Sequence, residues 1–205
     1  MSTETFWNDL YRTRRTWGER PNPLLAEIAG PLTPGTALDL GCGGGGDTVW
    51  LAGRGWQVTA VDVSGTAVDG VRAHVTEIGL GDRVTVERHD LSESLPAGTF
   101  DLISAQYLHT PLELDRARVL RDAARSLRPG GLLLIVDHGS IAPWSWNQDP
   151  DTHFPTPTEV AAEIGLDPGA WPVLRADMPR RQATGPGGQT ATVTDNVLLI
   201  RRADR

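Results

Sequence analysis

Short runs of aliphatic and β-branched residues alternate with longer amphipathic segments through the first two thirds of the chain. The runs predict five strands, at residues 36–40, 57–63, 84–88, 100–105 and 132–137. The segments between them predict helices at 47–53, at 64–78 with Ser64 as the N-cap, and at 112–127, where an Arg-Pro-Gly-Gly stretch ends the helix. Strands that alternate with helices at this spacing predict a parallel sheet with helices on both faces.

The last third of the chain departs from this alternation. Two β-rich segments, 173–183 and 191–202, flank a glycine- and proline-rich stretch at 184–190 and predict an antiparallel hairpin. The hairpin completes the sheet. The expected fold is therefore α/β: a seven-stranded, mostly parallel sheet with helices on both faces and a C-terminal antiparallel hairpin. At 205 residues, a single domain over 1–205 is expected.

Two aromatic-rich segments interrupt the pattern and predict coverings for a binding site. One lies within a helical segment at 1–30, and the other is a long insertion at 140–172 that is rich in proline and tryptophan. A loop of that length in a compact domain is usually a binding element or disordered, and its aromatic residues favour binding. The predicted lid residues, which would face a substrate, are Trp7, Tyr11, Trp17, Trp144 and Trp146.

Composition narrows the classes of partner. The chain has 19 basic and 26 acidic side chains, a net charge of −7, and no cluster of basic residues long enough to follow a nucleic acid backbone. Cys42 is the only cysteine and excludes an internal disulfide, which fits a reducing compartment. With no leader-like start and no apolar run of membrane-spanning length, we expect a cytoplasmic protein without a membrane partner, as a monomer or homodimer.

The most informative stretch is the glycine run that follows the first predicted strand. Glycines at the carboxyl end of a parallel strand let the backbone approach a ligand, and the next helix presents free N–H groups to it. Asp62 ends the second strand, from which a carboxylate can accept hydrogen bonds from both ribose hydroxyls. Because Gly41, Gly43 and Gly46 also satisfy the dinucleotide pattern GxGxxG, these residues alone leave two cofactor classes open.

The motif order over residues 36–137 resembles the class I S-adenosylmethionine-dependent methyltransferases, which have a Rossmann-like fold. The stretches that carry the resemblance are LDLGCGGGG, VTAVDVS, VERHDL, FDLISAQYLH and LRPGGLLLIVD, in that order. The N-terminal aromatic residues and Pro21-Asn22-Pro23 are also similar to the opening of tellurite-resistance and thiopurine-type methyltransferases. The resemblance implies a transferase that methylates a small molecule at an oxygen, nitrogen, sulfur or other chalcogen atom.

The resemblance also implies roles for individual residues. Asp39, Gly41, Gly43 and Gly45 would hold the methionine part of S-adenosylmethionine, Asp62 with Val63 the ribose, Asp90 with Leu91 the adenine, and Gln106 and Tyr107 would line the pocket.

A general base is needed only if the acceptor keeps a proton until attack. His109 and His138 follow the fourth and fifth strands at the edge where this architecture places substrates, and they are the candidate bases, with Tyr107 as a further catalytic candidate. No histidine spacing resembles a metal site, so no metal is expected.

Two other functions remain open from the sequence. An NAD(P)-dependent oxidoreductase would use the same glycines and Asp62, although the chain has no Tyr-x-x-x-Lys pair. A non-catalytic protein that binds S-adenosylmethionine would keep the same pocket without turnover.

Overall fold

A computed structural model describes residues 2–13, 17–145 and 147–204 of the chain. Trp146, one of the predicted lid residues, lies outside them. The helices are α1 (Thr3–Arg12), α2 (Pro23–Ala29), α3 (Gly46–Gly53), α4 (Gly65–Glu77), α5 (Arg116–Arg125) and α6 (Pro157–Ile164), with a 3₁₀ turn at Gly81–Arg83. The strands are β1 (Thr36–Leu40), β2 (Gln57–Asp62), β3 (Val84–Arg88), β4 (Phe100–Gln106), β5 (Leu127–His138), β6 (Val173–Asp177), β7 (Arg180–Thr184) and β8 (Thr190–Arg201).

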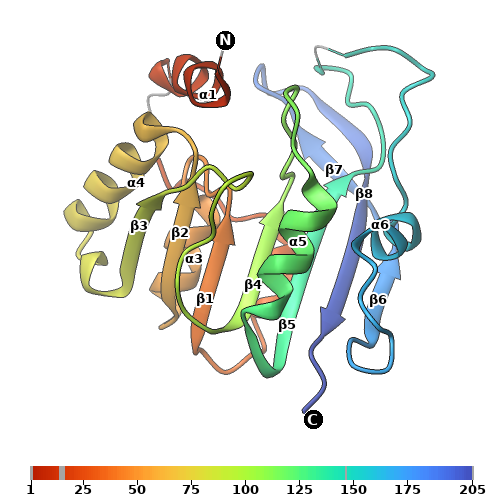
Figure 1. The fold of residues 1–205 in the computed structure, drawn as a ribbon. Coiled ribbons are helices and arrows are strands. Elements are labelled where there is room, and N and C mark those ends of the chain that lie inside the picture. The colour runs from red at the N-terminus through yellow and green to blue at the C-terminus, as the bar shows by residue number, and fades with distance from the viewer. Residues whose placement is uncertain (1, 14–16, 146, 205) are drawn as a thin grey trace.

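The strands form one sheet in the order β3-β2-β1-β4-β5-β8-β6 (Figure 1). The five strands from β3 to β5 are parallel, and β8 runs antiparallel between β5 and β6. Strand order reverses between β1 and β4, and in open α/β sheets ligands bind outside the carboxyl ends of the strands at such a point. The loop after β1 therefore lies at the position where a site is expected.

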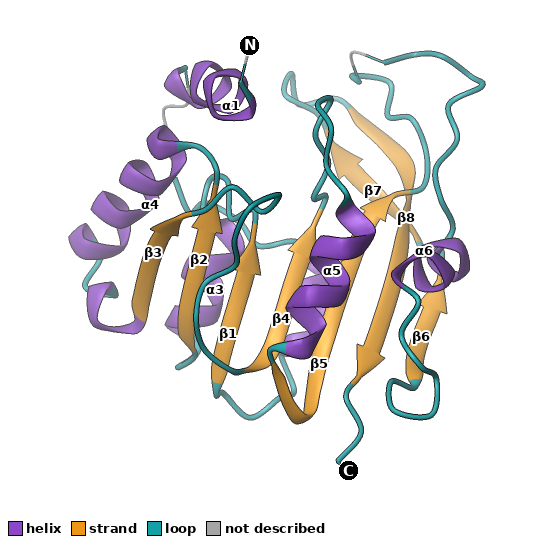
Figure 2. Ribbon diagram, viewed as in Figure 1, coloured by secondary structure: helices purple, strands orange, loops and turns teal. Residues whose placement is uncertain are grey.

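Helices cover both faces of the sheet (Figure 2), and each face has its own core. Leu134 and Val136 of β5 pack with α2, α3 and α4, whereas Leu133 and Ile135 pack with α5 and α6. This division follows from the alternation of side chains along a strand. It confirms the predicted α/β fold with a mostly parallel sheet, helices on both faces and antiparallel C-terminal strands.

The predicted C-terminal hairpin is wrong in one detail. Residues 173–183 form two strands rather than one, because Met178 and Pro179 interrupt the ladder, so that β6 and β7 pair with successive parts of β8. A proline has no N–H for a ladder hydrogen bond. The described residues thus contain eight strands where seven were expected.

Two predicted boundaries around α5 and β5 are also corrected. The helix expected at 112–127 covers only Arg116–Arg125, because the Asp115 side chain caps its start by accepting a hydrogen bond from Arg118 N. The expected helix stop at 128–131 lies inside β5, where Leu127 already pairs with Phe100. Gly130 has a left-handed φ of 79°, which lets the chain turn there while the strand continues.

The insertion at 140–172 is not one uninterrupted loop. Thr156 and Glu159 form a capping box that starts α6, and α6 buries Val160 and Ile164 against the sheet. Trp171 packs against the same core, and Arg202 lies over its ring at 5.7 Å. The part of the insertion from residue 157 onward is therefore scaffold.

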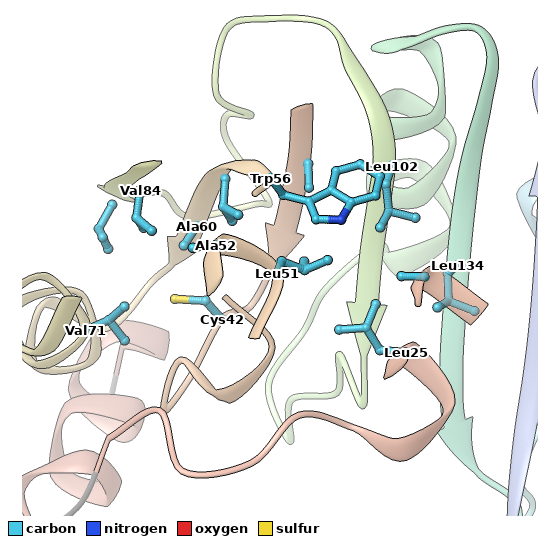
Figure 3. Packing of buried hydrophobic residues seen from close by; sticks show 14 of the residues in the cluster. Leu25, Cys42, Leu51, Ala52, Trp56, Ala60, Val71, Val84, Leu102 and Leu134 are labelled. Carbon is cyan, nitrogen blue, oxygen red and sulfur yellow. The ribbon is translucent and has the colours of Figure 1, made fainter. Parts of the chain in front are cut away.

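Trp56, which is 2% exposed, gives the core a stability test. Its indole extends into the cluster that contains Leu51 and Leu102 (Figure 3). We expect Trp56→Ala to lower the free energy of unfolding by about 3–5 kcal/mol, because the substitution leaves a cavity that the surrounding side chains cannot fill. Urea denaturation measures this, with the half-buried Trp50 as the matched control, for which Trp50→Ala should cost much less. Equal losses in the two variants would contradict this assignment of the core.

Candidate functional site

The glycine run after β1 makes a tight turn that requires glycine. Gly41, Gly43 and Gly45 have φ values of 69°, 50° and 77°, in the left-handed region. Gly45 precedes the first residue of α3, and its N–H donates to Cys42 O at 2.8 Å. The turn thereby directs the amino end of α3 toward the carboxyl edge of the sheet.

Asp62 stands at the end of β2, beside this turn. Its Oδ2 accepts a hydrogen bond from Gly43 N at 3.0 Å, and its Oδ1 accepts one from Ser64 N at 2.9 Å. Burial raises the pKa of Asp62, against these hydrogen bonds, which lower it. Since a carboxylate oxygen has two lone pairs, each Asp62 oxygen keeps acceptor capacity for one more donor. This arrangement suits a vicinal diol.

Asp39 lies beneath the glycine turn and is 2% exposed. Thr48 donates a hydrogen bond to its Oδ2 at 2.6 Å. Burial, followed by the negative charge of Asp47, raises the pKa of Asp39 to about 7, and burial raises the pKa of Asp47 to about 6. A cationic ligand group at the turn would relieve this concentration of negative charge.

A cavity that is open to solvent begins at Gly41 and Asp62 and reaches the segment after β4. The cavity brings together nine of the predicted site residues: Trp7, Tyr11, Gly41, Asp62, Val63, Asp90, Leu91, Tyr107 and His109. They come from five separate parts of the chain. Four of these parts meet because they follow parallel strands that end at one edge, and the fifth is helix α1.

Helix α1 covers this cavity. The Asn8 side chain accepts hydrogen bonds from Ser64 Oγ at 2.7 Å and from Thr66 N at 3.1 Å, which fixes α1 to the start of α4. Trp7 and Tyr11 stack with their ring centroids 6.2 Å apart, and a Cβ added to Gly43 would lie 2.7 Å from the Tyr11 hydroxyl. The predicted N-terminal cover is thus a helix over the glycine turn.

Several predicted residues lie away from the lining of the cavity. Trp17 packs against Gly70 of α4, where any Cβ would collide with its ring. Trp144 packs against Gly185 in the turn between β7 and β8. Gln106 donates to Ser104 Oγ at 2.8 Å, and its Oε1 is buried without a partner among the described residues.

His109 is part of a charged cluster at the far end of the cavity. Its Nε2 lies 3.2 Å from Asp137 Oδ1, and its side chain is 45% exposed. Arg116 Nη2 donates to both oxygens of Asp137 at 2.6 and 2.7 Å. Burial alone would raise the pKa of Asp137, but the hydrogen bond from His109 and the charge of Arg116 outweigh burial and lower it. Asp137 therefore stays ionised and faces Nε2 of His109, which favours the tautomer with the proton on that nitrogen.

Tyr107 is held by a second cluster. Its hydroxyl donates to Asp195 Oδ1 at 2.8 Å and accepts from Arg181 Nη2 at 3.0 Å. Burial, together with the negative charge of Asp195, raises the pKa of Tyr107 to about 12, so its hydroxyl stays protonated at neutral pH. The ring of His138 stacks on Tyr107 at 4.2 Å, and the desolvation that results lowers the pKa of His138, with His109 lowering it further.

Sequence reasoning missed Arg116, Arg181 and Asp195. Arg116 belongs to a helix whose other arginines pair with acidic neighbours or carbonyl groups, so nothing marked it as different. The one available signal for Asp195 was an acidic residue two positions before an apolar run in a predicted strand.

The remaining histidines have other partners. His89 lines the cavity, but its two ring nitrogens lie 2.9 Å from Ser94 Oγ and 3.0 Å from Glu87 Oε2. His153 is exposed beside Glu159. Within the described ranges, no group of three or more His, Cys, Asp or Glu side chains could hold a metal ion, and no helix there is long and apolar enough to cross a bilayer.

Residues 37–131 match the family model described as a methyltransferase domain. The match spans β1, the glycine turn, Asp62, Asp90 and the start of β5. Over these residues the chain is therefore similar to a methyltransferase domain, as the resemblance in motif order predicts.

Several known proteins are similar in sequence to part of this chain. The chain is 31% identical over 131 residues to ribosomal RNA small subunit methyltransferase C of Alcanivorax borkumensis, covering 62% of this chain and 39% of that protein. It is 38% identical over 125 residues to methyltransferase GfsG of Streptomyces halstedii, covering 58% and 44%. The chain therefore spans less than half the length of these two relatives.

A solved structure matches the whole methyltransferase chain. It comes from work on the conversion of a disulfide bond into a thioacetal group during echinomycin biosynthesis, and it has a TM-score of 0.74 and 25% identity. That likeness covers 100% of this chain and 93% of the other, so it includes α1 and the C-terminal strands.

The buried charge of Asp39 gives the site a test that needs no ligand. Its folded-state pKa of about 7 exceeds its ordinary value of 3.8, so the folded protein holds a proton that the unfolded chain releases, and stability falls as the pH rises between those values. We expect Asp39→Asn to raise the free energy of unfolding at about pH 8 by on the order of 2 kcal/mol, and by less at about pH 5.5.

Urea denaturation at the two pH values measures the effect. Asp69→Asn, at an exposed carboxylate on α4, is the control and should show no such pH dependence. If Asp39→Asn and the wild type lost stability in parallel as the pH rises, Asp39 would not be the buried titrating group.

Proposed function

We propose that this protein transfers a methyl group from S-adenosylmethionine to a small molecule that loses a proton from an oxygen, nitrogen or sulfur atom. The observation that carries the proposal is one cavity with two chemically different ends. Asp62 and the glycine turn lie at one end, and the Asp137-oriented imidazole of His109 lies at the other.

The first end fits the cofactor of the family. Asp62 has acceptor capacity for the two ribose hydroxyls, and Asp39 and Asp47 supply negative charge beneath the turn for the ammonium group. Asp90, Leu91 and Val63 line the part of the cavity next to Asp62, where the adenine would lie. When bound, S-adenosylmethionine supplies an electrophilic methyl group on a positively charged sulfur atom.

The second end fits a general base. Because Asp137 faces Nε2 at 3.2 Å, the basic nitrogen of His109 would be Nδ1, for which the described residues offer no hydrogen-bond partner. Nδ1 would take the acceptor's proton as the acceptor atom bonds to carbon, leaving an imidazolium that Asp137 stabilises. Tyr107 cannot do this, since its hydroxyl stays protonated at neutral pH. Positioning of the acceptor and exclusion of water by α1 would supply the rest of the rate.

A small acceptor is favoured over RNA by the distribution of positive charge. The arginines of α5 are engaged with acidic side chains or backbone carbonyls, Arg116 and Arg181 with buried carboxylates, and the net charge is −7. Binding to RNA needs free cations along a surface. The relative that acts on ribosomal RNA shares only part of its length with this chain, so it does not decide the acceptor.

Sulfur compounds come first in an acceptor screen. The structure from work on a disulfide-to-thioacetal conversion matches this chain from end to end, including the C-terminal strands that contribute Arg181 and Asp195. Phenols and amines come next, because the same base would serve them. An NAD(P)-dependent oxidoreductase and a non-catalytic S-adenosylmethionine-binding protein are the alternatives that the screen would separate.

The variant that tests the base is His109→Gln, which keeps a polar side chain of similar size. With an acceptor from the screen, we expect its turnover number to fall at least about 100-fold, because a positioned base contributes that much. Its affinity for S-adenosylhomocysteine should stay within about twofold of the wild type.

His153→Gln, at an exposed histidine outside the cavity, is the matched control and should turn over normally. Full activity in His109→Gln would remove the general base from the proposal. Absence of methyl transfer by the wild type across thiols, phenols and amines would count against the enzyme itself.

A further inference from the structure

Two aspartate–arginine pairs hold the two ends of one turn, residues 107–109, between β4 and α5. We propose that Asp195 and Arg181, contributed by the C-terminal strands, are positioning residues that fix this turn and so set the orientation of His109 for proton removal. The inference rests on the proposed function, because it concerns how the base is placed.

The first pair holds the start of the turn. Asp195 is 1% exposed, and its Oδ2 accepts from Arg181 Nε at 2.5 Å. Both residues bind the Tyr107 hydroxyl, which donates to Asp195 at 2.8 Å and accepts from Arg181 at 3.0 Å. The hydroxyl therefore has partners for its proton and for a lone pair, which fixes the ring of Tyr107.

The second pair holds the end of the turn. Asp137, itself bound by Arg116, lies 3.2 Å from His109 Nε2. Asp137 and His138 are adjacent in β5, so their side chains point to opposite faces of the sheet. Asp195 lies directly opposite His138 in the β5–β8 pairing. One register thus places one carboxylate on each side of the turn.

The turn itself needs to be held. Tyr107 has a φ of 50° and is the only non-glycine residue in the described part of the chain with a positive φ. A side chain at such an angle is strained and persists only where the surroundings impose it. The Tyr107 N–H donates to Val136 O at 2.8 Å, and the His109 N–H donates to Tyr107 O at 2.8 Å. The backbone conformation of Tyr107 therefore determines the position of the His109 backbone.

The rings transmit the same constraint. The ring centroids of His138 and Tyr107 lie 4.2 Å apart, and those of His109 and His138 lie 6.2 Å apart. The three rings therefore form one stack at the carboxyl edge of the sheet. If Tyr107 moved, the ring beneath His109 and the backbone before it would both move. If the Arg181–Asp195 pair only joined β7 to β8, its loss would not move His109.

The closing experiment measures the tautomer of His109 directly. In protein with ¹⁵N-labelled histidine rings, long-range ¹H–¹⁵N spectra recorded at a pH where the imidazoles are neutral distinguish a proton on Nε2 from one on Nδ1, and His109→Gln assigns the signals. The test variants are Asp195→Asn and Tyr107→Phe. The matched control is Arg175→Met, which breaks an arginine–aspartate pair on β6 that does not touch the turn.

We expect the wild type and Arg175→Met to show His109 as the single Nε2–H tautomer. Asp195→Asn and Tyr107→Phe should show a mixture of tautomers and a turnover number about tenfold lower than that of the wild type. Their affinity for S-adenosylhomocysteine should be unchanged. Thermal melts establish that each variant is folded. If Asp195→Asn does not fold, Tyr107→Phe, which removes only the hydroxyl, decides the question.

A single Nε2–H tautomer in the folded test variants, with wild-type turnover, would overturn the inference. The tautomer readout does not depend on the acceptor. If the wild type transfers no methyl group, the proposed function fails, and a mixed tautomer in the variants still supports the positioning of His109 by Asp195 and Arg181.

Discussion

The site depends on one constraint: parallel strands that lie side by side end at the same edge of the sheet. Residues that are far apart in sequence, such as Gly41, Asp62 and Tyr107, follow separate strands and meet there for that reason. The reversal of strand order between β1 and β4 opens space above this edge. The helices and the two cores serve to keep the strands in register, so that a displaced strand end would displace one part of the site.

The C-terminal strands have a second role beyond completing the sheet. Antiparallel pairing with β5 brings Asp195 level with His138, and this places the Asp195–Arg181 pair against the hydroxyl of Tyr107, which lines the cavity. The glycine turn and Asp62, together with Tyr107 and His109, come from the matched methyltransferase domain at residues 37–131, whereas Arg181 and Asp195 lie outside it. The residues that hold Tyr107 are thus contributed by a part of the chain that the family model does not match.

The sequence predicts the fold and the first end of the cavity well because their signals are local. The glycine run, the Ser64 cap and the strand-ending Asp62 each lie within a few residues of the structure that they determine. The second end depends on pairs that are distant in sequence: Arg116 and Asp137 are separated by 21 residues, and Tyr107 and Asp195 by 88. Such pairs follow from register, which a single sequence does not reveal. The interruption at Met178 and Pro179 and the helix hidden in the aromatic insertion were missed for a related reason, since tertiary packing decided both.

Binding of the cofactor is the central claim, and calorimetric titration of the purified protein with S-adenosylhomocysteine tests it most directly, with NADH titrated beside it. The account predicts a dissociation constant of about micromolar or tighter for S-adenosylhomocysteine, with no heat of binding from NADH. Binding of NADH without S-adenosylhomocysteine would contradict it.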